Sequence, residues 1–399
     1  MMTKEFEIML RLFGDFSFGR TSDTANIKAE AVPRIVKMAH LQGIWTCIYP
    51  QLCNAFDISK YKMSILALMS CSVRQNEFTM RILSEAEKNG IGYCLLKGIF
   101  AASLYAHPDY RISSDVDILI DPKDEKLMTE FLKSKGYEVE ERARHDHHMK
   151  ARHSVGGLLE VHISLYSHIT DRIYFGKEEM YTQEYVRINT DGKEYSTLGT
   201  NDNLNYLTAH FLKHFVRGES SIRQMMDLLL YMKKYDDEID FEKYNALLKR
   251  LRYDKLIATV KGIGVKYFGF DFAEDECNFE NVENVLDDCE HCGLFGIASS
   301  DDLSINRMFC LRRKEISPLR MKMMLMFEDE ESVFSKIFLP QQRLIELGYT
   351  YAQNKVFVPV AWMHKIFDRI FNRSKHVSSE GSKIMEKRAD MMKKLNMFD

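Results

Sequence analysis

Two aspartates in an apolar run constrain the fold of this chain more than any other feature. Residues 115–121 read DVDILID, and this alternation of polar and apolar residues predicts a strand. Successive side chains of a strand point to opposite faces, so Asp115 and Asp117 would share one face. Adjacent carboxylates repel each other and are costly to bury. Divalent cations would offset that cost, because Mg²⁺ binds carboxylate and phosphate oxygens and two such ions can clamp a phosphoryl displacement.

The sequence around this strand predicts a small mixed sheet. The expected elements are strands over 92–96, 115–121, 137–140 and 158–163, a hairpin over 184–198, and helices over 97–105 and 122–135. We expect Leu127, Phe131 and Leu132 to form the buried stripe of the helix over 122–135. On the strand over 158–163, Glu160 and His162 would share a face, because they are two residues apart.

Helical sequence is expected on both sides of this sheet, which makes the fold class α+β. Residues 27–47 and 58–88 show helix-length apolar periodicity, and the pattern is again helical from residue 201 onward. We predict a helical lead-in over 1–90, an α/β core over 91–200, a helical domain over 201–326, and a C-terminal helical segment over 327–399. The last segment ends in a polar tail whose composition favours disorder.

Composition limits the classes of function. A hydrophobic content of 45% and a charged content of 28% are typical of a soluble globular protein, and the net charge of −3 gives no reason to expect long nucleic acid as a partner. No apolar run reaches the roughly 18 residues of a membrane span. Residues 1–14 include acidic side chains and lack a signal-peptide core. With eight scattered cysteines, these features favour a reducing, cytoplasmic location.

Two further segments have competing interpretations. Cys289 and Cys292 could bind zinc, but only Cys277 and Cys310 are near enough in sequence to complete a site, so thiols in a helical packing surface are favoured. Residues 356–373 combine aromatic side chains with a basic face. That segment could contact a membrane or a partner peripherally, although burial of a C-terminal helix is the commoner use of such a pattern.

The motifs together resemble a known superfamily. A Lys-Gly pair at Lys97-Gly98, an arginine at Arg111 and the Asp115-Val116-Asp117 motif are similar to the DNA polymerase β-like nucleotidyltransferases. More narrowly, they resemble the branch called uncharacterised nucleotidyltransferases, in which a later Asp/Glu-x-His motif corresponds to Glu160-Val161-His162. The resemblance covers about residues 30–370 and includes His210, His214, Arg223, Asp227 and the segment over 338–340.

This resemblance implies a metal-dependent active site. Asp115 and Asp117 would bind two Mg²⁺ ions, and Glu160 would complete the metal site and act as the general base. The wider superfamily has Gly-Ser where this chain has Lys97-Gly98. Lys97 could therefore supply charge to the triphosphate, while Gly98 could let backbone N–H groups approach it.

Other polar residues near the motif leave alternatives open. Arg111 and Ser114 are candidates to bind phosphates, and Arg111 could equally form an ion pair with the aspartates. The histidines at 145, 147, 148 and 153 favour an exposed hairpin or the edge of a substrate site over a transition-metal site. The remaining candidates for the nucleotide or acceptor pocket are His210, Lys213, His214, Arg223 and Asp227. For Asp227, a helix-surface ion pair with Arg223 is favoured.

The resulting hypothesis is a Mg²⁺-dependent nucleotidyltransferase. It would transfer a nucleoside monophosphate from a nucleoside triphosphate to an acceptor hydroxyl on a sugar, an antibiotic-like small molecule or a protein. One alternative is a nucleotide-binding or partner-binding protein that keeps the fold without turnover. Another is a toxin-type nucleotidyltransferase that acts on protein or tRNA.

Overall fold

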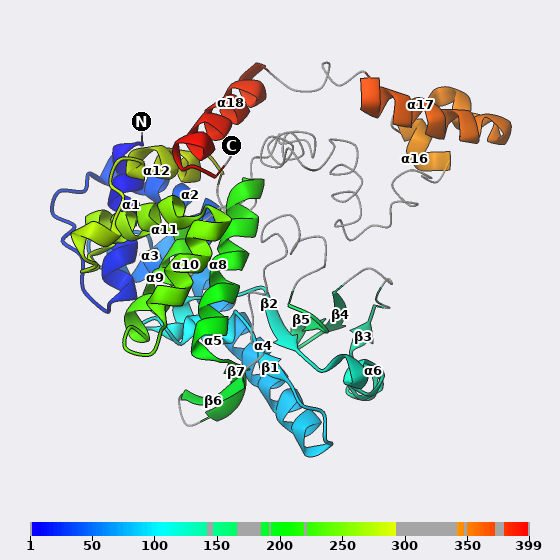
Figure 1. The fold of residues 1–399 in the computed structure, drawn as a ribbon, viewed down its shortest axis with the longest axis horizontal. Helices are drawn as coiled ribbons and strands as arrows, with labels where there is room; N and C mark the ends of the chain where they lie inside the picture. Colours follow the sequence, from blue (N-terminus) through cyan, green and yellow to red (C-terminus); the bar gives the residue numbers. More distant parts are fainter. Residues whose placement is uncertain are drawn as a thin grey trace. The chain divides into compact units, whose positions relative to one another are not determined.

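The computed structural model describes residues 2–140, 142, 147–165, 185–190, 193–218, 222–292, 341–346, 349–371 and 379–397 (Figure 1). The chain divides into two units. The first comprises residues 1–142, 147–298 and 391–398, and the second contains residues 143–146, 299–390 and 399. The four segments expected from the sequence remain a prediction.

A seven-stranded mixed sheet forms the centre of the first unit, within the described residues, and confirms the α+β class. Its order is β3-β4-β5-β2-β1-β7-β6, with β2 parallel to β5 and β1 parallel to β7, while the other neighbours are antiparallel. The strands are β1 Cys94–Leu95, β2 Asp115–Leu119, β3 Glu138–Val139, β4 His148–His153, β5 Gly157–His162, β6 Tyr185–Thr190 and β7 Lys193–Leu198.

The two faces of β2, β4 and β5 have opposite chemistry. One face belongs to the apolar core, which includes Val116, Ile118, Met149, Ala151, Leu159 and Val161. The other face carries most of the polar and charged residues of these strands, together with Leu119 and Leu158. Asp117 pairs with Glu160 across the parallel strands, and His148 pairs with His162 across the antiparallel ones. The period of two predicted for 115–121 and 158–163 is therefore confirmed, whereas β4 was not predicted as a strand.

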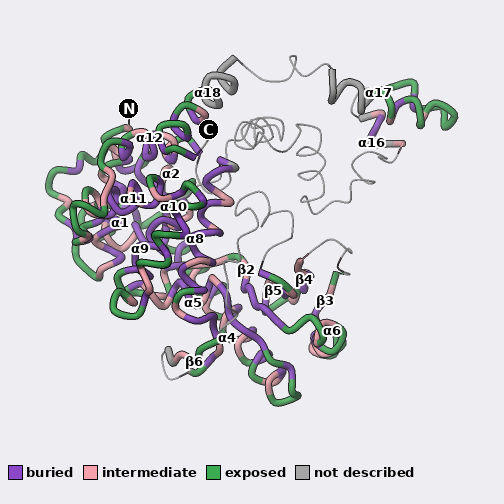
Figure 2. The backbone as a smooth tube through the Cα atoms, viewed as in Figure 1, coloured by how far each residue is buried: buried purple, intermediate pink, exposed green. Residues whose placement is uncertain are grey.

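Helices cover the sheet and extend the first unit. Their bounds are α1 Lys4–Ser17, α2 Val32–Leu41, α3 Trp45–Leu52, α4 Lys62–Lys88, α5 Ile99–Ala102, α6 Glu125–Ser134, α8 Thr200–Arg217, α9 Ile222–Lys234, α10 Phe241–Leu251, α11 Asp254–Ile263 and α12 Val282–Cys292. Ile82, Leu83, Met128 and Leu132 of α4 and α6 belong to the apolar core of the sheet. The helix α9 is buried along most of its length (Figure 2).

Short helical turns connect these elements. They are η1 Ala29–Ala31, η2 Ser59–Tyr61, η3 Pro108–Tyr110, η4 Pro122–Asp124, the π-helical turn η5 Gly264–Phe268 and η6 Glu274–Glu276. Polar caps begin several of the helices. The Thr3 hydroxyl accepts a hydrogen bond from the Phe6 N–H at α1, and the Asp240 carboxylate accepts one from Lys243 at α10. Such caps satisfy backbone donors that lack a partner within the helix.

Three predicted helices differ from the observed ones. The segment over 27–47 contains two helices, α2 and α3, because Gly43 adopts a positive φ of 65° between them. The helix predicted over 97–105 is limited to α5, where the Ser103 hydroxyl donates to the Phe100 carbonyl at the helix end. In α6 the buried stripe runs through Met128 and Leu132, so the prediction for Leu127 was wrong: this side chain is 47% exposed.

The second unit contains α16 Gln341–Glu346, η7 Thr350–Gln353, η8 Lys355–Phe357, α17 Val358–Phe371 and most of α18 Ser379–Lys394. Leu344, Ala352 and Ala361 form its small core. Within 356–373, Val356 and Met363 are exposed, and a peripheral contact there stays a prediction. The segment over 338–340 lies outside the described residues.

The C-terminal tail forms a helix where its composition favoured disorder. Residues 379–394 make α18, and the first unit includes the buried Met391, Met392, Leu395 and Met397. The apolar side chains at these positions supply the burial that stabilises the helix end. Among the residues that the structure describes, no helix combines the length and apolar character needed to cross a membrane.

Candidate active site

Three carboxylates predicted for the metal site lie on the same face of the sheet. Asp115 and Asp117 are on β2, and Glu160 is on β5 directly opposite Asp117 in the parallel register. Their neighbours in sequence, Val116 and Val161, are fully buried on the other face. The alternation that buries the core thus brings the three acidic side chains together.

Asp117 is the most buried of these carboxylates, with 0% exposure. Its Oδ1 atom lies 3.2 Å from Lys97 Nζ and 3.2 Å from His162 Nε2, whereas its buried Oδ2 atom has no hydrogen-bond partner. Burial alone would raise the pKa of Asp117, but Lys97 and His162 outweigh burial and hold this pKa well below its usual range. Asp117 is therefore a carboxylate anion with one oxygen available for a ligand.

Glu160 has the opposite electrostatic environment. Burial, and then the negative charge of Asp117, raise the pKa of Glu160 to about 7, although Lys97 acts against the shift. At neutral pH, Glu160 can therefore either accept or release a proton. A cation placed between these carboxylates would favour the ionised form of Glu160.

The Lys97-Gly98 pair shapes the backbone next to β2. Gly98 has φ 75° and ψ −106°, a conformation that favours glycine, and a Cβ atom there would lie 3.5 Å from the Asp115 carbonyl oxygen. Lys97 Nζ also lies 3.3 Å from His210 Nε2 on α8. The charges of Asp117, Asp115 and Glu160 raise the pKa of Lys97 against the effect of burial. Lys97 is thus a cation held among the carboxylates.

Ser113, which the sequence analysis did not select, contacts one of the three carboxylates. The Ser113 hydroxyl donates to Asp115 Oδ1 at 2.9 Å. Ser114 is exposed, and its carbonyl accepts a hydrogen bond from Gln75. Strand alternation could have identified Ser113, because residues two apart share a face.

Arg111 forms an ion pair, but its partner is not one of the predicted aspartates. Its Nε atom lies 3.0 Å from Asp227 Oδ1 and its Nη2 atom 2.5 Å from Asp227 Oδ2, while the Tyr105 hydroxyl donates to the same carboxylate at 2.7 Å. Arg223 instead donates to the carbonyls of Gly43 and Ile112. The favoured Asp227–Arg223 pair was therefore wrong, because the loop before β2 brings Arg111 to Asp227 in a bidentate geometry.

Histidines surround the carboxylates on two sides. Beyond His162, the rings of His147 and His148 lie 5.3 Å and 5.1 Å from the His162 ring. On α8, His210 and His214 have ring centroids 4.5 Å apart. Burial and nearby positive charges lower the pKa of His147 to about 2 and that of His210 well below 6.5, so both imidazoles are neutral.

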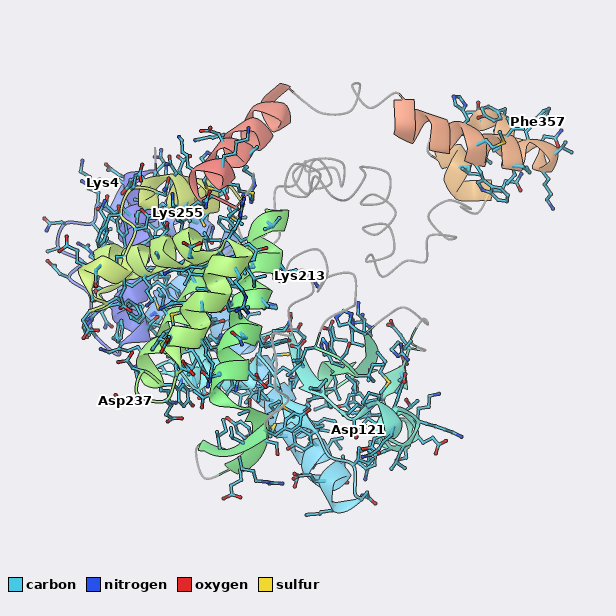
Figure 3. The ribbon with its side chains drawn as sticks, in the orientation of Figure 1. Lys4, Asp121, Lys213, Asp237, Lys255 and Phe357 are labelled. Atoms are coloured by element: carbon cyan, nitrogen blue, oxygen red, sulfur yellow. The ribbon has the colours of Figure 1, made fainter. Side chains whose placement is uncertain are left out.

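Lys213 adds a positive charge to this histidine-rich region. It lies on α8 (Figure 3), and its charge contributes to the lowered pKa of His147. The other two histidines of the predicted group are elsewhere: His153 stacks on Phe78 at 4.4 Å, and residue 145 lies outside the described residues.

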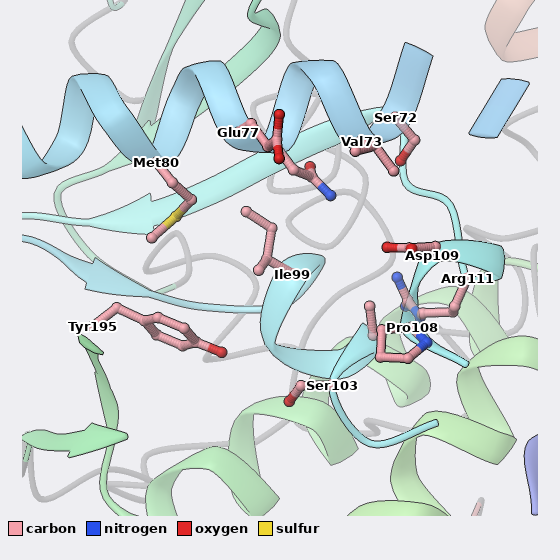
Figure 4. A pocket seen from close by; sticks show the side chains of 12 residues that line it. Ser72, Val73, Glu77, Met80, Ile99, Ser103, Pro108, Asp109, Arg111 and Tyr195 are labelled. Carbon is pink, nitrogen blue, oxygen red and sulfur yellow. The ribbon is translucent and has the colours of Figure 1, made fainter. Parts of the chain in front are cut away.

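A cavity of about 290 Å³ is lined by residues that include parts of α4, α5 and η3. Met80, Ile99 and Tyr195 line part of it and also belong to, or pack against, the apolar core of the opposite sheet face. Asp109 and Arg111 lie together on another wall (Figure 4). Because this cavity adjoins the apolar face, it is separate from the three carboxylates.

The donor atoms at the carboxylates fit a hard divalent cation. Asp115, Asp117 and Glu160 offer only oxygen, and the unsatisfied Oδ2 atom of Asp117 is a buried acceptor that a cation would satisfy. The zinc alternative at Cys289 and Cys292 has no such support, because both thiols are buried on α12 and no candidate metal group in the described ranges includes them.

A comparison with solved structures finds several that are similar to this chain. The solved structures similar to this chain include the antibiotic-resistance factor ANT(2'')-Ia, with 12% identity, coverage of 45% of this chain and 92% of that chain, and a TM-score of 0.34. They also include the lincomycin-bound lincosamide antibiotic adenylyltransferase LnuA, with 17% identity, 38% and 93% coverage, and a TM-score of 0.28. An antigenic nucleotidyltransferase-like protein from Paracoccidioides brasiliensis has 18% identity, 48% and 93% coverage, and a TM-score of 0.30.

These identities and TM-scores are too low to carry an argument about this chain. A search of curated proteins finds no match. The family model described as uncharacterised nucleotidyltransferase matches residues 28–264, which is more than half of the chain and includes all three carboxylates. The chain therefore belongs to the uncharacterised nucleotidyltransferase family.

Proposed function

We propose that this protein is a Mg²⁺-dependent nucleotidyltransferase that uses a nucleoside triphosphate as donor and a hydroxyl-bearing small molecule or protein as acceptor. The observation that carries the proposal is the environment of Asp117. This carboxylate is fully buried and ionised, lies opposite Glu160 in the register, and keeps one oxygen without a hydrogen-bond partner. A purely structural aspartate would have both oxygens satisfied.

Asp115, Asp117 and Glu160 hold two Mg²⁺ ions in this proposal. The bound ions neutralise phosphate charge and stabilise the entering and leaving oxygens of the displacement. Lys97 supplies a positive charge beside Asp117. Its ammonium group would also stabilise the charge of the leaving pyrophosphate when a triphosphate is bound beside the carboxylates.

Glu160 is the proposed general base, because this carboxylate lies opposite Asp117 in the register and, once ionised, can accept the proton of an acceptor hydroxyl. The acceptor hydroxyl transfers its proton to Glu160 while its oxygen forms a bond to the α-phosphorus. The bond from that phosphorus to the bridging oxygen breaks, and pyrophosphate leaves. The products are the nucleotidylated acceptor and pyrophosphate, and Glu160 later releases the proton to water.

Arg111 is excluded from phosphate binding in this proposal. Its guanidinium is buried and paired with Asp227, so moving it to a nucleotide would leave the Asp227 carboxylate without its counter-ion. Lys97 and Lys213 are better candidates for phosphate contacts. Gly98 keeps its proposed role beside the phosphates, and its φ of 75° is a backbone conformation that residues with a side chain rarely adopt.

Donors labelled at different phosphates test the reaction type. We expect label from the α-phosphate to appear on an acceptor and label from the γ-phosphate to appear only in pyrophosphate, provided that Mg²⁺ is present. Asp115→Asn should abolish both signals, whereas the control Asp121→Asn changes an exposed aspartate at the end of the same strand. Transfer of the γ-label to an acceptor, or α-transfer that survives Asp115→Asn, would contradict the proposal.

A further inference from the structure

Three histidines form a second cluster next to the carboxylates, and the proposed reaction does not use it. His147, His148 and His162 each offer one ring nitrogen, and these atoms lie within 4.8 Å of one another. Their ring centroids are 4.6, 5.3 and 5.1 Å apart. For His147 and His148 the sequence favoured an exposed hairpin or the edge of a substrate site, and the fold brings both rings against the buried His162.

The backbone positions of this cluster are fixed by the sheet. His148 and His162 are directly opposite each other on the antiparallel strands β4 and β5, so their side chains share a face. His147 precedes β4, and its carbonyl accepts a hydrogen bond of 2.9 Å from the Ile163 N–H. Ligands carried on paired strands are held more rigidly than ligands on loops.

The hydrogen bond to Asp117 leaves one nitrogen of His162 available. His162 is 5% exposed, and its Nε2 atom lies 3.2 Å from Asp117 Oδ1. When Nε2–H donates to this carboxylate, the neutral ring carries its lone pair on Nδ1. That Nδ1 atom is buried and has no hydrogen-bond partner in the structure. Metal-binding histidines commonly donate their other ring N–H to a carboxylate in this way.

We propose that His147, His148 and His162 bind one transition-series divalent cation of the Zn²⁺ class, at a site distinct from the Mg²⁺ site of the carboxylates. Imidazole nitrogen suits Zn²⁺, Co²⁺ or Ni²⁺, whereas Mg²⁺ prefers oxygen. Three protein ligands leave a fourth coordination position open. The bound ion fixes the His162 ring and, through its hydrogen bond, the orientation of Asp117, so His162 is a positioning residue for the carboxylate.

The cluster has charges of both signs around it. The positive charges of Lys97 and Lys213 act electrostatically on the His147 ring. The carboxylate oxygens of Asp117 and Glu160 lie 3.2 Å and 3.9 Å from His162 Nε2. Tetrahedral bonds of about 2.0–2.1 Å require nitrogen separations of about 3.4 Å, and the three ring nitrogens already lie within 4.8 Å of one another.

Titration of the chelator-treated full chain with Co²⁺ tests this site, with excess Mg²⁺ present and no nucleotide. We expect one equivalent of Co²⁺ with visible d–d bands of a nitrogen-ligated ion, displaced by Zn²⁺. His147→Ala and His148→Ala should each weaken binding at least about tenfold. His107→Ala removes an exposed histidine outside the cluster and should leave binding unchanged. Absence of stoichiometric binding, or unchanged affinity in both ligand variants, would overturn the proposal.

A measurement on the unmodified chain avoids any effect of substitutions on folding. Zn²⁺ should protect His147 and His148 from carbethoxylation by diethylpyrocarbonate, as detected by mass spectrometry, while His107 reacts equally with and without Zn²⁺. If His147, His148 and His107 were each modified equally with and without Zn²⁺, the site would be refuted. Asp115→Asn should keep Co²⁺ binding while it loses Mg²⁺-dependent nucleotide binding. The two proposals can therefore fail separately.

Discussion

Asp117 and Asp227 are both buried and both paired with a cation, but their surroundings differ. Asp227 receives two hydrogen bonds from Arg111 and one from Tyr105, so both of its oxygens are satisfied. Asp117 contacts Lys97 and His162 through one oxygen, and its other oxygen has no partner. Asp227 connects α9 to the loop before β2, whereas Asp117 faces two further carboxylates.

This difference separates a structural ion pair from a candidate active site. A fully satisfied buried pair stabilises the fold, and removing one member leaves an uncompensated charge. A buried carboxylate with an open oxygen next to Asp115 and Glu160 is costly unless a ligand completes it. We therefore expect substitutions at Asp227 to affect mainly stability and substitutions at Asp117 to affect mainly function.

Asp227→Ala should have the largest effect of these substitutions, a loss of folding stability. It leaves the Arg111 guanidinium buried without its carboxylate, and we expect the free energy of unfolding to fall by about 3–5 kcal/mol in urea denaturation. The control Asp237→Ala removes an exposed acid after the same helix and should change stability by less than about 0.5 kcal/mol. Equal effects of the two substitutions would remove the structural role assigned to Asp227.

Asp117→Asn should reduce turnover strongly while the protein still folds cooperatively. Loss of one preorganised electrostatic group typically lowers kcat by about 10²–10³-fold, and we expect at least that loss in pyrophosphate release. The control Asp121→Asn should leave kcat unchanged. Turnover that survives in Asp117→Asn would mean that this carboxylate does not hold the catalytic cation.

The pH dependence of stability should reveal the neutral state of His210. Its pKa is well below 6.5 in the folded chain, so the unfolded chain binds more protons as pH falls below 6.5 and stability is lost. His210→Gln should flatten the slope of unfolding free energy by up to about 1.4 kcal/mol per pH unit between about pH 6.5 and 5. Urea titrations at several pH values measure this slope for the wild type and for His210→Gln. Identical slopes in the two proteins would contradict the neutral state assigned to His210.

The affinity for Mg²⁺ should depend on the protonation of Glu160. Below its pKa of about 7, the cation must displace a proton from this carboxyl, so affinity should fall by up to about tenfold for each pH unit. Calorimetric titration of Mg²⁺ between pH 6 and 8 would measure the slope. Glu160→Gln should bind Mg²⁺ weakly at every pH, and a wild-type affinity independent of pH would argue against Glu160 as a ligand.

The smallest expected difference is between two adjacent serines. Ser113→Ala removes the hydrogen bond to Asp115 and should weaken Mg²⁺-dependent nucleotide binding by about 1 kcal/mol, or roughly fivefold. Ser114→Ala should have no measurable effect, because the Ser114 side chain is exposed. If Ser114→Ala weakened nucleotide binding more than Ser113→Ala, then Ser114 would be the serine that supports the site.

Local patterns predicted the parts of the site that depend on neighbours in sequence. The alternation in 115–121 placed Asp115 and Asp117 on one face, and that in 158–163 did the same for Glu160 and His162, as observed. The hairpin over 184–198 is present as β6 and β7, with residues 191 and 192 outside the described part of the chain. The shared faces follow from a period of two and the hairpin from the turn signal at residues 191 and 192, both of which a single sequence displays directly.

Contacts between distant segments could not be predicted in the same way. The partner of Asp227 is 116 residues away, and the contact of Lys97 with His210 joins residues 113 apart. Spacing on one helix suggested Arg223 for Asp227, but tertiary packing turned Arg223 toward backbone carbonyls. The burial of α18 likewise depends on packing, whereas composition alone indicated disorder.

The central claim is that Asp117 completes a cation site for a nucleotide, and equilibrium binding tests it most directly. Each nucleoside triphosphate is titrated with and without Mg²⁺ against the wild type, Asp117→Asn and Asp121→Asn. We predict Mg²⁺-dependent binding to the wild type and Asp121→Asn and its loss in Asp117→Asn. Binding of the same strength in all three, or no Mg²⁺-dependent binding to any triphosphate, would contradict the account.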